Sequence, residues 1–167
     1  MIKNTAFKLP IILGLALSSL TSASIYAELL AHKDLTSAIS LSIADTAVST
    51  CKANGINISV TVVGRSGEIL VQVRGDNTGP HTMENSMRKA YTARTFRSPS
   101  GDTEARLKND PAFALIHLNN IIANRGGLPI KFGDETIGGV GASGAPSGDK
   151  DEACVKAGID KVANLLN

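Results

Sequence analysis

The glycine-rich segment GGVGASGAPSGDKDE, from Gly138 to Glu152, constrains the fold more than any other part of the sequence. Residues 139–144 match the G-x-G-x-x-G pattern of dinucleotide-binding loops. That pattern binds a dinucleotide where it follows the first strand of a βαβ unit and leads through a helix to a second parallel strand. Here one predicted helix and no further strand follow, and the sequence contains no GK[ST] motif. The segment therefore favours neither of the two common nucleotide-binding folds.

The same glycines indicate a strand whose backbone lies close to something else. Glycine is disfavoured inside a strand unless another group approaches its main chain. A helix, a neighbouring subunit or a flat ligand could lie against this strand, and tight packing of the last helix explains the glycines equally well. The turn at residues 144–148 also offers backbone N–H groups to a carboxylate or phosphate at the start of that helix.

The first 27 residues have the order of a secretory signal peptide. Met1 to Lys8 carries two lysines and no acid, Leu9 to Leu20 is almost entirely apolar, and small residues follow. Cleavage is expected after Ala27, with Ala23 as the alternative. A membrane anchor is the other interpretation, but the apolar run is short for a span. We therefore expect a periplasmic or secreted protein whose folded domain comprises residues 28–167.

The charge of that domain is balanced. The whole chain has 17 Lys and Arg against 15 Asp and Glu, and without the two leader lysines 15 basic residues remain. Nucleic-acid binding requires clustered excess cations, so a nucleic-acid partner is not expected. No segment after the leader is long and apolar enough to cross a membrane.

The two cysteines, Cys51 and Cys154, are predicted to form a disulfide. Disulfides persist in exported proteins, and no third thiol competes for either partner. The bridge would join the first helix of the domain to the last, and two buried free thiols are the alternative. The sequence has no CxxC redox motif, and two distant cysteines do not make a zinc site.

Hydrophobic spacing and turn residues predict an α+β fold. Helices are expected at Asp34–Asn54, His81–Phe96, a short polar stretch ending at Leu107, and Lys150–Leu166. Short strands are expected at Ile56–Val62, which alternates as a half-buried strand does, and at Ile69–Arg74, Asn120–Asn124, Leu128–Phe132 and Thr136–Ser143. Strands that are consecutive within each half of the chain predict a mainly antiparallel sheet with helices packed on it.

Some local details remain open or rest on capping signals. Either Asp34 or Thr36 can cap the first helix. Asp149 and Glu152 are spaced as the N-cap and N3 residues of a capping box at the last helix. The segment Pro111–Asn119 is ambiguous.

Four motifs in this order resemble the GlcG/HbpS-like family, also called the haem-degrading domain family. They are VQVRGDNTGP at residues 71–80, RKAYTA at 88–93, GGLPI at 126–130 and IGGVGASGAPSGDKDE at 137–152. The resemblance spans about residues 35–166. It implies a five-stranded antiparallel sheet with flanking helices in a profilin-like arrangement. It also implies a homo-oligomer, often an octamer, and, for some exported members, haem binding.

A haem site needs an apolar slot, an axial ligand and cations for the propionates. His81, at a loop–helix junction, is the preferred iron ligand. His32, near the expected mature N-terminus, and His117, in the ambiguous segment, are the other histidines. Each could instead be a solvated or packing residue. Met83 and Met87 could supply sulfur, although methionines at helical spacing are more often part of a core.

The helix at His81–Phe96 has basic residues that could pair with propionates: Arg88, Lys89, Arg94 and Arg97. Lys89 is preferred because it lies in the RKAYTA motif, which also contributes Tyr91. A solvated face with local pairs to Glu84 or Glu104 is equally consistent. The resemblance implies that a serine or threonine oxygen can be a ligand, which adds Ser100 to the candidates.

No classical catalytic set is present, since the sequence contains neither G-x-S-x-G nor H-E-x-x-H. The first hypothesis is therefore an exported protein that binds haem or a similar planar tetrapyrrole for capture, sequestration or sensing. The second is an enzyme that degrades haem or acts on a small acid of the glycolate kind. The third is an accessory subunit of an oligomer that has no ligand.

Overall fold

An antiparallel sheet of four strands lies at the centre of the protein, for which the computed structural model describes residues 28–166. In spatial order the strands are β2 (Ile69–Val73), β1 (Ser59–Val63), β4 (Glu135–Ser143) and β3 (Gly127–Phe132). Every neighbouring pair runs antiparallel, as predicted. The two central strands come from opposite halves of the chain, so the sheet joins both halves into one core.

The prediction of a fifth strand at Asn120–Asn124 is wrong, because residues 120–124 form no strand in the described part of the chain. The segment is irregular because its backbone pairs with α2 (His81–Phe96) rather than with a strand edge. The Ile122 N–H donates to Thr92 Oγ1 at 2.9 Å, and Arg88 Nη2 donates to the Ile121 carbonyl at 2.7 Å. Side chains of a helix therefore satisfy the backbone groups that a sheet ladder would have used.

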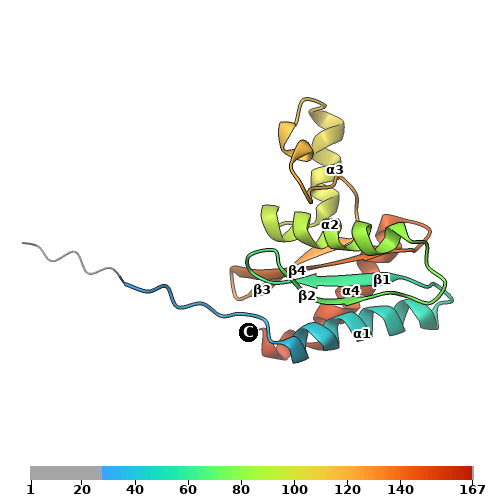
Figure 1. Ribbon diagram of the computed structural model, residues 1–167, viewed down its shortest axis with the longest axis horizontal. Coiled ribbons are helices and arrows are strands. Elements are labelled where there is room, and N and C mark those ends of the chain that lie inside the picture. The colour runs from blue at the N-terminus through green and yellow to red at the C-terminus, as the bar shows by residue number, and fades with distance from the viewer. Residues whose placement is uncertain (1–27, 167) are drawn as a thin grey trace, which may run out of the picture. The chain divides into compact units, whose positions relative to one another are not determined.

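Helices cover both faces of the sheet (Figure 1). The helix α2 lies on one face, and α1 (Ser37–Ala53) and α4 (Gly148–Lys161) lie together on the other. On the α2 side, α3 (Ser100–Asn109) and the 3-10 turn η1 (Ala114–His117) form a projecting arm. A second 3-10 turn, η2 (Ala163–Leu165), follows α4. None of the helices in the described part is long and apolar enough to cross a membrane.

The helix ends agree only partly with the capping prediction. Thr36 caps α1, its Oγ1 accepting from the Ile39 N–H at 3.2 Å, whereas Asp34 pairs with Arg65. At α4 the predicted capping box is wrong, because the N-cap residue is Ser147 and no side chain bonds to the exposed N–H groups. Asp149 instead pairs with Arg125 at 2.9 Å.

The strand β1 is buried on both faces, not half-buried as its alternating sequence predicts. Val60 and Val62 face the apolar core under α1 and α4, and Ser59 and Thr61 face α2. There Ser59 Oγ bonds with Thr82 Oγ1 at 2.8 Å, and Thr61 Oγ1 bonds with Ser86 Oγ at 2.7 Å. The alternation therefore distinguishes an apolar interface from a polar, hydrogen-bonded one.

The glycines of β4 let α2 lie directly on the sheet. A Cβ at Gly139 would meet the Ala90 carbonyl oxygen, and one at Gly141 would lie 2.6 Å from the Ala90 nitrogen. The strand therefore lacks side chains at these positions because a helix packs on its backbone, which is one of the expected explanations. The helix is α2, however, and not the last helix of the chain.

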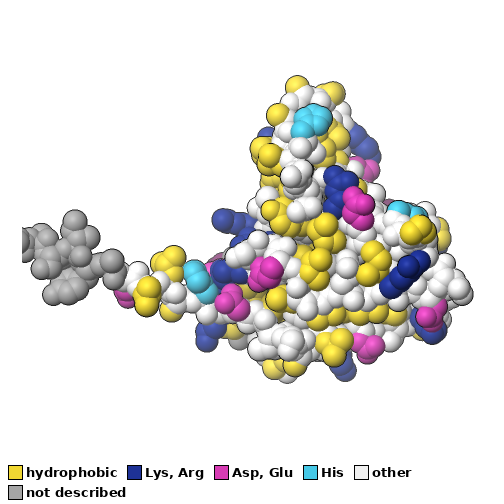
Figure 2. Space-filling view, in the orientation of Figure 1, with side chains coloured by type: hydrophobic (Ala, Val, Ile, Leu, Met, Phe, Trp, Pro, Cys, Tyr) yellow, Lys and Arg dark blue, Asp and Glu magenta, His cyan; other side chains and the backbone are white. Residues whose placement is uncertain are grey.

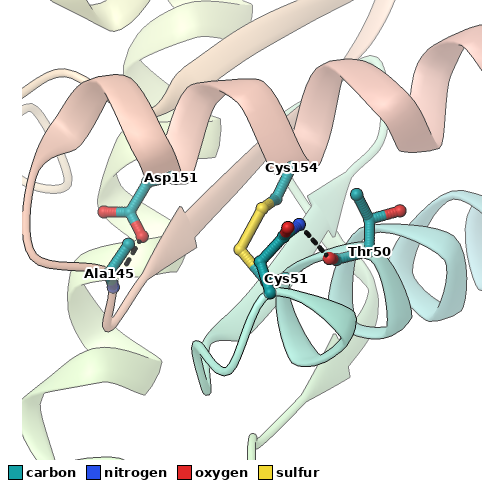
Figure 3. Close-up of a disulfide and its surroundings, with 6 residues drawn as sticks. Thr50, Cys51, Ala145, Asp151 and Cys154 are labelled. Carbon is teal, nitrogen blue, oxygen red and sulfur yellow. Dashed lines mark hydrogen bonds between the residues drawn. A yellow bond between two sulfur atoms is a disulfide. The ribbon is translucent and has the colours of Figure 1, made fainter.

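The predicted disulfide between Cys51 and Cys154 is present and joins α1 to α4 (Figure 3). The two Cα atoms lie 5.7 Å apart, and both residues belong to the apolar core between these helices and the sheet. The predicted signal peptide, residues 1–27, lies outside the described residues. It remains an expectation.

Candidate functional site

A buried ion pair between Lys89 and Asp151 is the most unusual group of charges in the fold. Lys89 Nζ lies 2.8 Å from Asp151 Oδ2, and the two side chains are only 2% and 4% exposed. Lys89 comes from α2 and Asp151 from the first turn of α4, so the pair joins the helices of opposite faces past the end of the sheet. Gly126 makes room for the ammonium, since a Cβ there would lie 2.9 Å from Nζ.

The Asp151 carboxylate is held on both oxygens. Its Oδ1 accepts from the Ala145 N–H at 3.0 Å (Figure 3), while Oδ2 accepts from Lys89. Burial raises the pKa of Asp151, and the Lys89 ammonium and the Ala145 N–H oppose that rise. The two opposite charges therefore balance each other, and their side chains have little contact with water.

The pair lies at the base of a hollow of about 570 Å³, which we call the inner hollow. The starts of α2 and α4 border it, through Gly79 and His81 on one side and Ser147 and Gly148 on the other. The rest of its polar lining consists of amides and hydroxyls: Asn57, Asn77, Thr78, Thr82, Asn85, Asn124 and Ser143. This composition suits a hydrophilic molecule better than an apolar one.

Two further hollows follow the outer side of α2, and we call their shared lining the outer α2 face. One, of about 250 Å³, is lined by His81, Glu84, Asn85, Arg88 and Ile122. The other, of about 610 Å³, again includes Glu84 and Arg88 and reaches His117 on the arm. Figure 2 shows histidine side chains over the start of α2 and over the arm, with basic and acidic side chains between them. Both histidines are exposed.

Arg88 lines both outer hollows, as Glu84 does, and it has an unused donor. Its Nη2 donates to the Ile121 carbonyl, and its Nη1 lies 3.7 Å from Glu84 Oε1. Its Nε is buried and has no hydrogen-bond partner among residues 28–166. A buried donor without an acceptor is costly, so this nitrogen indicates where an acceptor from outside the chain would be favourable.

The other predicted site residues lie apart from this face. Tyr91 is half-buried against the β1–β2 turn, where it would contact a Cβ at Gly67. Arg94 lies over Gly139, and burial, followed by the charges of Arg65 and Arg97, lowers its pKa. The basic residues of α2 therefore do not form the single cationic side that the sequence suggested.

Ser100 is fully buried, and both roles of its hydroxyl are in use. Its Oγ donates to the Asn124 carbonyl at 2.7 Å and accepts from the Gly127 N–H at 2.9 Å. These bonds attach the start of α3 to the segment that leads into β3. His32 is exposed ahead of α1, and Met83 and Met87 are half-buried on α2.

Asp151 is not among the site residues predicted from the sequence, although its position carries a signal. Asp151 precedes the buried Val155 by four residues, so it continues the apolar stripe of α4. Lys89 likewise lies on the buried stripe of α2, between Ser86 and Ala93. A charged residue on the buried stripe of each helix is the pattern that predicts such a pair.

The comparisons agree with this architecture. The family model of the haem-degrading protein HbpS-like family matches residues 35–160. A crystal structure of HbpS is 35% identical, covering 86% of this chain and 99% of that one, with a TM-score of 0.76. A double mutant of Streptomyces reticuli HbpS is 34% identical over 83% of this chain and 94% of that one, with a TM-score of 0.77.

A more distant structure, PduOC in complex with heme, shares the fold. It is 20% identical, covers 76% of this chain and 94% of that one, and has a TM-score of 0.69. No curated protein matches the chain. The family model spans most of the sequence, and HbpS matches nearly end to end. The chain therefore belongs to the HbpS-like family of haem-degrading proteins.

Proposed function

We propose that this protein is an exported haem-binding protein that captures, sequesters or senses haem. Family membership supports haem as the ligand, and PduOC, solved with heme, has the same fold. The observation in this chain that carries the proposal is Arg88, whose side chain lines both the hollow that contains His81 and the hollow that contains His117, and whose buried Nε has no partner among residues 28–166. This combination provides two candidate iron ligands and a cation for a propionate.

The residues of the outer α2 face fit haem in chemistry. A histidine nitrogen can ligate the iron, and His81 and His117 are both exposed and available for it. The Arg88 guanidinium would pair with a propionate, and Ile122 offers an apolar contact in the same hollow. Lys89 is not needed here, because Asp151 already neutralises it.

The test is a hemin titration of the oxidised protein comprising residues 28–167, followed by the Soret band. We expect a shifted Soret band for the wild type and a weakening of at least about tenfold for whichever of His81→Ala and His117→Ala removes the ligand. His32→Ala is the matched control, since this exposed histidine lies on neither outer hollow, and it should bind as the wild type does. Unchanged affinity in both test variants would refute the proposed face, and no Soret shift in the wild type would refute haem binding.

Degradation of haem is the second candidate function, because the matching family is described by that activity. A reductant added to the hemin complex in aerated buffer, where dissolved dioxygen is the oxidant of the macrocycle, should then abolish the Soret band and release iron. A band that persists under reduction would leave binding as the function.

Export and self-association complete the proposal. The disulfide between α1 and α4 supports an oxidising compartment, and the sequence favours a cleaved leader. Leu115 and Leu118 on the arm are 42% and 54% exposed, which favours burial of the arm in a homo-oligomer, an octamer being the size implied by the family resemblance. Light scattering on the purified protein measures that size directly.

A further inference from the structure

The inner hollow has unused hydrogen-bond donors. Haem bound on the outer α2 face would not contact them. A lysine ammonium has three N–H donors. Within the described residues Lys89 donates one hydrogen bond, to Asp151, and the side chain is 2% exposed. Two donors of this little-exposed side chain therefore remain at the base of the hollow. Acceptors supplied by a bound molecule would satisfy them.

Two helix starts add positive potential to the same hollow. Within residues 28–166 no side chain caps α2 or α4, and the first-turn residues Gly148 of α4 and His81 of α2 both line the hollow. The leading N–H groups of a helix lack partners within the helix and carry partial positive charge. The hollow thus combines a buried ammonium with two uncapped helix starts, each from a helix of 14 residues or more.

Asp151 balances the charge of Lys89, and no second acid among the described residues around the hollow opposes the positive potential of the helix starts. Among the described residues around the hollow, Asp151 is the only acid, and its two oxygens are already bonded to Lys89 and Ala145. The other side chains are mainly amides and hydroxyls. Asn85 Nδ2, for example, donates to Ser143 Oγ at 2.9 Å. An anion with hydroxyl groups matches both features, because its charge meets the donors and its hydroxyls meet the amides.

We propose that the inner hollow binds a small hydroxylated organic acid, with its carboxylate between Lys89 and the start of α4. The volume of about 570 Å³ lies within the range of small-molecule sites. The asparagines and Ser143 contact the hydroxyl groups. The proposal does not depend on haem binding, since the two sites share only the rim residues His81 and Asn85.

The probe is gluconate, a carboxylate with several hydroxyl groups, measured by calorimetry on the oxidised protein comprising residues 28–167. Glucose is the neutral comparison with similar hydroxyl groups, and inorganic phosphate is a second oxyanion without them. We expect gluconate to bind and glucose not to bind. Phosphate should displace gluconate, but with a lower affinity than that of gluconate.

The decisive variant is Ser147→Asp. Aspartate is a favoured N-cap, so the change should stabilise α4, yet it places a carboxylate where the ligand's own would lie. Gluconate affinity should fall about tenfold or more, because the introduced carboxylate and the carboxylate of gluconate would lie side by side and repel each other. Thr36→Asp is the matched control, since it makes the same charge change at the N-cap of α1, which does not line the hollow. It should leave gluconate binding unchanged.

The outcomes of these experiments distinguish the organic-acid site from the haem site. Absence of gluconate binding to the wild type, equal binding of glucose, or an equal loss in Thr36→Asp would overturn the organic-acid site. Tighter binding of phosphate than of gluconate would also overturn it, in favour of a phosphate site. Hemin binding should be retained by Ser147→Asp, so a failure of the haem proposal would appear in the Soret titration and not in this series.

Discussion

The buried pair of Lys89 and Asp151 can be removed one charge at a time or as a unit, and we expect the two experiments to differ sharply. Lys89→Met keeps a side chain of similar length and leaves the Asp151 carboxylate with the Ala145 N–H as its one hydrogen-bond donor among residues 28–166. Asp151→Leu leaves the ammonium, 2% exposed, with no acceptor among these residues. The double variant leaves neither charge.

The expected magnitudes follow from burial. Breaking a buried pair by removing one partner costs roughly 3–5 kcal/mol, whereas replacing both partners by apolar residues is often close to neutral. Because the pair borders a hollow that can admit water, we take the lower end, about 3 kcal/mol, for each single variant. The double variant should lose little, so the coupling between the two residues should approach the sum of the single losses, about 6 kcal/mol.

Urea unfolding followed by circular dichroism measures these differences. With a slope near 1.5 kcal/mol per molar urea, each single variant should lower the unfolding midpoint by about 2 M. The double variant should unfold near the wild-type midpoint. Single variants that cost under about 1 kcal/mol, or a double variant equal to their sum, would show that both charges are well hydrated and would refute this description of the pair.

Two further predictions concern stability. The Cys51–Cys154 bridge closes a loop with a sequence separation of 103, so the Cys51→Ala, Cys154→Ala double variant should lose roughly 4–5 kcal/mol in urea unfolding; a loss near zero would contradict the loop-entropy argument. Burial raises the pKa of Glu152 above its ordinary 4.5, with Asp149 and Asp102 adding to the rise and Arg125 opposing it. The folded state therefore binds the proton more tightly than the unfolded state. This group destabilises the fold increasingly as pH rises from 4.5 to its folded pKa, and the effect is complete above that pKa. Glu152→Gln should accordingly stabilise the protein at neutral pH, with the gain shrinking as pH falls from the folded pKa to below 4.5; a gain that is constant from pH 4 to 8 would refute it.

Local features of the sequence predicted most of the elements. The helix α2 begins and ends at the predicted residues, because a loop of Gly, Asp and Asn precedes it and Ser-Pro follows it. The strands β3 and β4 lie within one residue of their predicted ends, separated by a short glycine turn. Hydrophobic period and turn residues act over a few positions, so a single sequence is sufficient for them.

The candidate site was predicted less completely. His81 and His117 were identified as separate candidates, and the structure places each beside Arg88 on the outer α2 face. The preference for Lys89 led to the buried pair rather than to a propionate partner. Tyr91, Arg94 and Ser100 lie elsewhere, because the turn of α2 and the packing of the arm direct their side chains to other contacts.

The sequence by itself determined the order of elements, the family, and the pairing of the cysteines, since local periodicity, contiguous motifs and a single pair of thiols leave few alternatives. The tertiary structure alone decided which helix the β4 glycines admit, why residues 120–124 do not form a strand, and that Lys89 meets Asp151 across 62 positions of sequence. These contacts depend on where α2 lies on the sheet and on how its Lys89 meets α4. That meeting is set by the packing of the whole domain, not by the spacing of neighbouring residues.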